Sequence, residues 1–306
     1  VTVDLDVDGN TTTDGITNVG NFSTDGGTIK LDGNYPTGTC NVALGDNALG
    51  SGSLSGDFNT AVGTNALLAN TSADANTAIG RSSLCSNTTG NCNTGLGMNA
   101  LLGNTEGFGN VAVGRSSMVA NTTGDNNVAV GQNSLVSNTT ADNNTAVGSC
   151  ALNTNTTGAN NTAVGYIALC SNTTGGCNVA IGRDSLDSNT TGSSNVAVGT
   201  DTLQANTTGG SNIAIGDDAL KGNSTASFNI GIGATALQNN QTGTGNVAVG
   251  YQSLPSNTVS NNTAVGYRSL CANTTGTENT AVGKDALKAN TTGTNNTAIG
   301  YNSMYE

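Results

Sequence analysis

The chain has 306 residues, a formal net charge of −12 and 44 glycines, with only 3% aromatic residues and no histidine. This composition cannot supply a large aromatic core, so a folded chain must gain its order from repetition. The eight Lys and Arg residues are scattered, which argues against a nucleic-acid partner, and no apolar run is long enough for a membrane span.

Residues 1–40 precede the repeats and are predicted to form a β cap or connector. Val1, Val3, Leu5 and Val7 alternate with polar residues, a pattern typical of a strand with one apolar face. The first turn of a repeat array has an open parallel edge, which invites aggregation unless another segment covers it. We therefore expect this segment to cover or connect the start of the array.

The same segment contains a weak calcium motif. Asp4, Asp6 and Asp8 are followed by Gly9, as in the first half of a calcium loop. Gly15 stands where such a loop carries a bidentate Glu. An amphipathic strand is therefore favoured over a calcium site, and no metal or cofactor is predicted.

Residues 41–306 form sixteen copies, the last incomplete, of N-T/V-A-V/I-G-x-x-A/S-L-x-x-N-T-T-G-x-x. Thirteen of the fifteen intervals between first asparagines are 17 residues, one is 18 and one is 16. Counted from that asparagine, position 5 is always Gly and position 9 is Leu or Met. Position 12 is Asn in every copy from Asn70 to Asn290. Such regularity predicts a repeat architecture.

The residue types predict an all-β, parallel β-solenoid with one repeat per turn. Positions 2 to 4 are β-formers, the glycine ends the strand, and N-T-T-G is turn chemistry in which a glycine permits positive φ. Stacked turns about 4.8 Å apart would place like residues in ladders, with asparagine amides bonded between turns. The ladder residues chosen as structural sites are Asn87, Asn121, Asn138, Asn172, Gly80, Gly114, Gly165, Gly182, Leu84, Leu135 and Leu169.

The sequence leaves the orientation of the strands open. Either positions 2 and 4 point inward, with alanine outside, or alanine points inward and the Val/Ile row at position 4 is exposed. In both cases a continuous apolar row faces outward along the coil. Such a row usually marks a partner surface, and the simplest partner is another copy of the chain.

Two repeats carry cysteines at positions 10 and 17: Cys85 with Cys92, and Cys170 with Cys177. Placement of both partners at equivalent positions twice predicts a disulfide within each turn and an oxidising, extracellular setting. The alternative is a pair of reduced small hydrophobes. Cys40, Cys150 and Cys271 have no such partner.

The glycosylation sequons and the tyrosines each allow a structural and a functional interpretation. N-x-T/S sequons recur at Asn87, Asn121, Asn138, Asn155, Asn172, Asn189 and Asn206. Glycans on successive turns would collide, so glycosylation of the whole row is not expected. Tyr166, Tyr251, Tyr267 and Tyr301 share position 6, and mutual shielding is favoured over sugar stacking. Without histidine, and with dispersed carboxylates, no catalytic arrangement is visible, so the chain is predicted not to be an enzyme.

The block Asn178-Val-Ala-Ile-Gly182, with variants such as Asn161-Thr-Ala-Val-Gly165, is similar to the core motif of YadA-like trimeric autotransporter adhesin head repeats. The similarity covers residues 41–306 and implies a left-handed β-roll, three chains side by side, and binding of host or matrix molecules at a cell surface. The family's usual repeat is shorter, and no coiled-coil stalk or membrane anchor is seen in this sequence.

The extended repeat with its N-T-T-G turn also resembles repeat arrays of tail-fibre-like bacteriophage proteins. LDVDGN (5–10) and TIKLDGNYPTGTCNVALG (28–45) are similar to the lead-in sequences of those fibres. The leading hypothesis is therefore an extracellular, cell-surface or virion fibre shaft, forming a homotrimer and presenting a glycan or protein receptor-binding tip. Alternatives are a self-assembling filament or matrix protein and an ice-binding solenoid using the Thr rows at positions 13 and 14.

Overall fold

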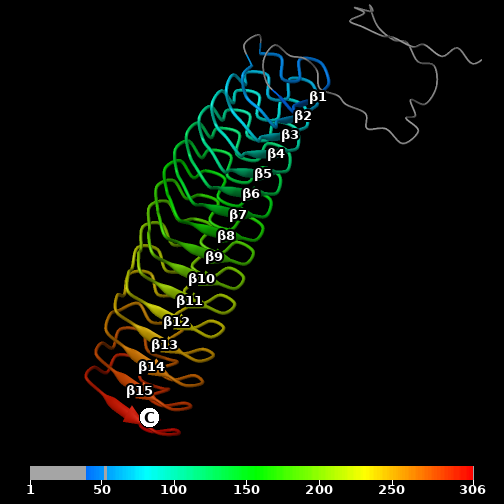
Figure 1. The fold of residues 1–306 in the computed structure, drawn as a ribbon. Coiled ribbons are helices and arrows are strands. Elements are labelled where there is room, and N and C mark those ends of the chain that lie inside the picture. Colours follow the sequence, from blue (N-terminus) through cyan, green and yellow to red (C-terminus); the bar gives the residue numbers. More distant parts are fainter. Residues whose placement is uncertain (1–38, 52–53, 306) are drawn as a thin grey trace, which may run out of the picture. The chain divides into compact units, whose positions relative to one another are not determined.

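The computed structural model describes residues 39–51 and 54–305. The cap or connector predicted for residues 1–40, with the candidate calcium residues Asp4, Asp6 and Asp8, thus lies outside the described residues except for its last two positions. The described chain is an all-β parallel solenoid in which each turn carries one strand (Figure 1). The predicted fold class is confirmed.

All sixteen strands belong to one sheet, and each pairs in parallel with its neighbours in the chain. Equivalent positions lie opposite one another, as in Val196 with Ile213 and Ala197 with Ala214. The strands are β1 (Val42–Leu44), β2 (Thr60–Val62), β3 (Thr77–Ile79), β4 (Thr94–Leu96), β5 (Val111–Val113), β6 (Val128–Val130), β7 (Thr145–Val147), β8 (Thr162–Val164), β9 (Val179–Ile181), β10 (Val196–Val198), β11 (Ile213–Ile215), β12 (Ile230–Ile232), β13 (Val247–Val249), β14 (Thr263–Val265), β15 (Thr280–Val282) and β16 (Thr297–Ile299).

The interior of the coil is narrow and is filled by a few rows of side chains. Alanine at position 3 points inward, as Ala163 and Ala197 show with 0% exposure. The leucine at position 9 packs opposite it and is equally buried in Leu135 and Leu169. Because adjacent strand residues face opposite sides, positions 2 and 4 point outward. The structure thus selects the second of the two orientations that the sequence leaves open.

The invariant glycine at position 5 is required by both its φ angle and its packing. Gly114 has φ +128°, and a Cβ built there would lie 2.7 Å from the carbonyl oxygen of Gly131 in the next turn. No side chain fits such a contact, and L-residues rarely adopt this conformation. Each glycine therefore lets the coil leave the strand while successive turns stay in backbone contact.

Three non-glycine positions adopt left-handed backbone conformations. Positions 7, 9 and 17 have φ near +50° to +60°, as in Cys150 (58°), Leu152 (50°) and Asn160 (61°). By contrast, the glycine at position 15, where positive φ was predicted, does not adopt it. A Cβ on Gly107 would instead meet the Gly124 carbonyl oxygen at 2.5 Å, so close approach is the reason for glycine there. The prediction for position 15 was wrong in its cause.

Candidate functional site

The outer surface of the sheet is a uniform surface that follows all the strands of the described solenoid. We call it the sheet face and define it as the side chains at positions 2 and 4 of β1–β16. Every one of them is Thr, Val, Ile or Leu, so the sheet face carries no charge. Its most exposed members at position 4 are between 36% and 72% accessible: Leu44, Ile79, Leu96, Val147, Ile181, Ile215, Val282 and Ile299. A contiguous apolar surface of this kind is unusual for a monomer and is typical of an interaction site.

Two buried asparagine ladders, at positions 1 and 12, hold the interior of the coil together. Asn172 at position 12 donates through Nδ2 to Asn155 Oδ1 in the preceding turn (2.7 Å) and to the Gly175 carbonyl (2.9 Å). Asn161 at position 1 donates to the same Gly175 carbonyl (2.9 Å), and its Oδ1 accepts the backbone N–H of Asn178 (2.9 Å). Both amides are therefore satisfied without water, as a buried polar group requires.

The position-12 ladder includes Asn87, Asn121, Asn138 and Asn172 and continues without a break to Asn290. The same bonds occupy the amide nitrogens of the N-T-T sequons. Since Asn121 and Asn138 are 0% exposed and donate through Nδ2, a folded chain has no free amide to carry an N-glycan in this row. These asparagines are structural.

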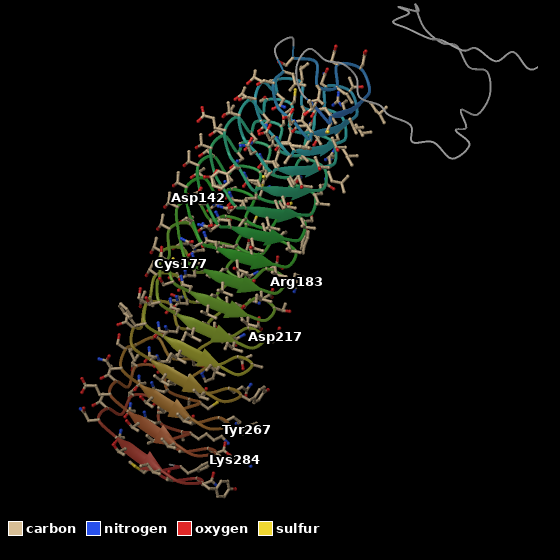
Figure 2. The ribbon with its side chains drawn as sticks, in the orientation of Figure 1. Asp142, Cys177, Arg183, Asp217, Tyr267 and Lys284 are labelled. Carbon is tan, nitrogen blue, oxygen red and sulfur yellow. The ribbon has the colours of Figure 1, made fainter. Side chains whose placement is uncertain are left out.

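The structure does not form the predicted disulfides Cys85–Cys92 and Cys170–Cys177, and every cysteine of the described residues is a free thiol. Position 10 belongs to the turn that follows the strand, where it meets position 7. Position 17 belongs to the segment just before the next strand. Figure 2 labels Cys177 at one edge of the coil and Arg183, at position 6, at the other. Sequence spacing alone did not reveal this separation.

Burial perturbs one of these thiols strongly. The pKa of Cys170 is raised from 9.0 to about 11, first by burial, then by the charges of Asp187 and Cys150, and it is lowered slightly by a hydrogen bond with the Asn153 backbone. Burial also raises the pKa of Cys85. A thiol with a raised pKa carries little thiolate at neutral pH and is a poor nucleophile.

Charged side chains pair across neighbouring turns at positions 7 and 10. Lys221 Nζ lies 2.9 Å from Asp218 Oδ1 in its own turn and 3.0 Å from Asp201 Oδ2 in the preceding turn. These hydrogen bonds raise the pKa of Lys221. Arg183, at position 6, lies 2.7 Å from Asp184 Oδ2 in its own turn and 3.3 Å from Asp201 Oδ1 in the following turn. Being partly exposed, such pairs add only about 0–1 kcal/mol each. The Lys221–Asp201 pair was not predicted, because its two residues are 20 apart and do not align in a 17-residue repeat.

Near the C-terminal end of the described solenoid, the side chains at position 6 form an aromatic and cationic ladder. Tyr251 and Tyr267 stack with centroids 5.4 Å apart, and Lys284 Nζ lies 5.8 Å from the Tyr267 ring and 5.6 Å from that of Tyr301. Figure 2 labels Tyr267 and Lys284 side by side on this edge. Because ring faces meet neighbouring members of the ladder, the arrangement favours mutual shielding over stacking of a sugar. Tyr166 stands apart, on an earlier turn, and is exposed.

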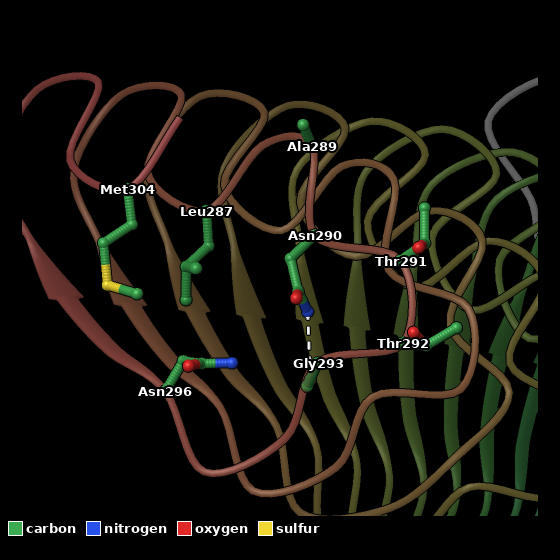
Figure 3. Close-up of a pocket in the computed structure, with 8 residues that line it drawn as sticks. All are labelled: Leu287, Ala289, Asn290, Thr291, Thr292, Gly293, Asn296 and Met304. Carbon is green, nitrogen blue, oxygen red and sulfur yellow. Dashed lines mark hydrogen bonds between the residues drawn. The ribbon is translucent and has the colours of Figure 1, made fainter. Parts of the chain in front are cut away.

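A hollow of about 390 Å³ lies at the last described turn and is lined by ladder residues (Figure 3). Leu287, Asn290 and Gly293 form its wall, with Asn296 and Met304 beside them. Met304 is 50% exposed, whereas Met118 at the equivalent position of an interior turn is 0% exposed. The hollow is therefore the uncovered interior of a turn and not a separately built pocket.

Within residues 39–51 and 54–305, no group of three or more metal-ligating side chains comes together. No helix in this part of the chain is long and apolar enough to cross a membrane. Comparisons of the chain with family models, with curated proteins and with solved structures find no match. The stacked strands and their regular repeat define a tandem-repeat β-solenoid protein.

Proposed function

We propose that this chain is a non-enzymatic structural or adhesive fibre shaft, located outside the cell or on a virion, and that copies of the chain associate through the sheet face. The observation that supports this most directly is the unbroken, uncharged sheet face running along sixteen strands. Apolar surface of this extent loses contact with water when a matching surface covers it. The rod then acts as a spacer for a glycan- or protein-binding tip.

A second copy is the partner that the charge distribution favours. The chain carries a net charge of −12, so two copies repel each other wherever their charged edges meet. Positions 2 and 4 carry no charged residue, and equivalent rows on two copies have the same spacing. Contact through the sheet face therefore combines a long apolar surface with little charge repulsion, and closure of three copies around one axis would give a homotrimer.

The test is the mass of the protein in native buffer, measured for the wild type and for charged variants. A homotrimer of the 30.0 kDa chain has a fixed mass, whereas a self-assembling filament does not. We expect Val147→Lys with Ile181→Lys, both on the sheet face, to dissociate the assembly. The matched control is Thr157→Lys with Thr191→Lys, at exposed position 14, which should leave the mass unchanged. A wild type that is monomeric at all concentrations would refute the proposal.

Ice binding is the second candidate function, and the structure favours the sheet face for it over the Thr rows at positions 13 and 14. Thr88 Oγ1 donates to the Thr105 carbonyl (3.0 Å), so the position-13 hydroxyls are used within the coil and do not favour the row first considered. On the sheet face, however, eight of the sixteen strands place Thr at position 2 beside the apolar residue at position 4. This candidate is tested by measuring the thermal hysteresis of the wild type and of the Val147→Lys, Ile181→Lys variant, which we expect to be dissociated. This measurement separates ice binding from self-association.

A further inference from the structure

Successive turns contact each other through side chains that are 20 residues apart in the sequence. A residue at position 10 meets position 7 of the preceding turn: Lys221 Nζ lies 3.0 Å from Asp201 Oδ2, and Gln238 Nε2 donates to Asp218 Oδ2 (3.2 Å). The contact does not need a long side chain. Asn153 Nδ2 donates to the Asn133 backbone carbonyl (2.9 Å), also 20 residues away.

Cys150 and Cys170 occupy this same pair of positions. Cys150 is at position 7 in the turn of β7, and Cys170 is at position 10 in the turn of β8. The thiol of Cys170 is hydrogen-bonded with the backbone of Asn153, which lies three residues after Cys150 in the same turn, and the charge on Cys150 acts on Cys170. Both side chains are half-buried and both thiols are free. The sulfur of Cys170 therefore lies over the turn that carries Cys150.

We propose that Cys150 and Cys170 form a disulfide that joins the turn of β7 to the turn of β8 in an oxidising thiol buffer. With a small disulfide RSSR as the oxidant, the Cys150 thiolate attacks one sulfur and releases RS⁻, forming a mixed disulfide. The deprotonated Cys170 then attacks Sγ of Cys150 and releases the second RS⁻. Two protons leave the protein with the two RSH molecules, and the two cysteine sulfurs are oxidised while RSSR is reduced.

The order of the two steps follows from the surroundings of the thiols. Burial raises the pKa of Cys170, so this thiol carries little thiolate, and we expect it to act second, when the mixed disulfide is already beside it. The bond would add a covalent link between two turns that otherwise contact through backbone ladders, buried rows and hydroxyl bonds such as that of Thr154 Oγ1 to the Cys170 carbonyl (2.8 Å). Because repeats are stabilised by their immediate neighbours, this link opposes separation of the turns at that point. Neither residue lies on the sheet face, so the link and self-association are independent.

The experiment uses the full-length chain with Cys177→Ser, which leaves one pairing for Cys170 in this region. The folded protein is equilibrated with oxidised and reduced glutathione, alkylated under denaturing conditions, and cleaved after Tyr166 with chymotrypsin. We expect a cross-linked peptide pair, two hydrogens lighter than the sum of its thiol forms, that contains Cys150 and Cys170. If both cysteines are instead alkylated, or carry glutathione, the proposal is overturned.

The matched control is Cys150→Ser, which keeps Cys170 and Cys177. In this variant we expect no disulfide between Cys170 and Cys177, because the fold places positions 10 and 17 on different segments. A Cys170–Cys177 bridge in Cys150→Ser, or in the wild type, would restore the pairing expected from sequence spacing and refute the inter-turn link. Cys85 and Cys92, which lack a partner 20 residues away, should form no disulfide within the chain in any variant.

Discussion

Removal of one amide from the position-12 ladder tests whether the ladder stabilises the fold. In Asn172→Ala, Asn155 Oδ1 loses its 2.7 Å donor and Asn189 Nδ2 loses its 2.8 Å acceptor. The Gly175 carbonyl keeps its bond from Asn161 (2.9 Å), so it is not orphaned. One buried acceptor and one buried N–H are therefore left unpaired, at roughly 1–3 kcal/mol each, while Asn189 Nδ2 keeps its bond to the Gly192 carbonyl (3.0 Å). The expected loss is about 2–6 kcal/mol, a large part of a typical protein's stability.

The free energy of unfolding from urea titration, followed by circular dichroism, gives the global effect. Repeat arrays can open locally, so hydrogen exchange at the backbone amides of the adjacent turns should rise first. The control is Thr174→Ala, an exposed residue two positions away, which should change stability by under about 0.5 kcal/mol. Asn172→Ala matching that control would refute the ladder argument.

A double substitution separates lost hydrogen bonds from lost packing. Asn155→Ala combined with Asn172→Ala removes the acceptor that Asn172→Ala alone orphans. The double variant should therefore cost less than the sum of the single variants, since residues that share a bond are not additive. Equal or greater cost would mean that cavity formation, and not the unpaired amide, dominates.

Three further measurements test other parts of the structure. Gly114→Ala should destabilise by more than about 2 kcal/mol, whereas Gly300→Ala, with φ +116° but nothing within 4 Å of its Cβ, should cost less in the same unfolding titration. At pH 8, Cys170, with its pKa at about 11, should react with iodoacetamide about 100-fold more slowly than a peptide thiol of pKa 9.0, and an equal rate would refute its burial. Burial raises the pKa of Asp187, so its carboxyl favours folding only when protonated and this contribution is lost as the pH rises; Asp187→Asn should stabilise at pH 7 but not at pH 3, by thermal unfolding.

The sequence predicted the fold because a repeat multiplies every local signal. One copy of Thr-Ala-Val-Gly is weak evidence for a strand, but sixteen copies in register permit only stacked turns. Position 5 was predictable for the same reason, since only glycine occurs there. The sequence could not predict which residues of the strand face the interior. Ala163 and Val164 are both apolar, and either could have faced a small interior.

The backbone of the leucine row could not be predicted from residue type. Leu169 has φ 52°, a left-handed conformation that costs a leucine roughly 1–2 kcal/mol and that sequence preferences assign to glycine or asparagine. Burial of the side chain from water offsets this cost by about 1.5–3 kcal/mol. At position 17 the residue type does indicate the left-handed conformation. Asn143 and Asn160 have positive φ, and asparagine adopts this conformation more readily than most residues.

The one turn that lacks a residue shows what the repeat conserves. Between Asn246 and Asn262 the interval is 16 residues, yet both asparagine bonds of that turn remain. Asn246 Nδ2 and Asn257 Nδ2 donate to the Val259 carbonyl at 2.8 Å and 2.6 Å, and this carbonyl lies one residue earlier in the turn than its usual counterpart. The strand and the leucine turn keep their length, so the missing residue falls in the segment after position 12. The segment after position 12 must therefore place one backbone carbonyl within hydrogen-bond distance of two buried asparagine amides. The number of residues in the segment can vary as long as this carbonyl keeps its position.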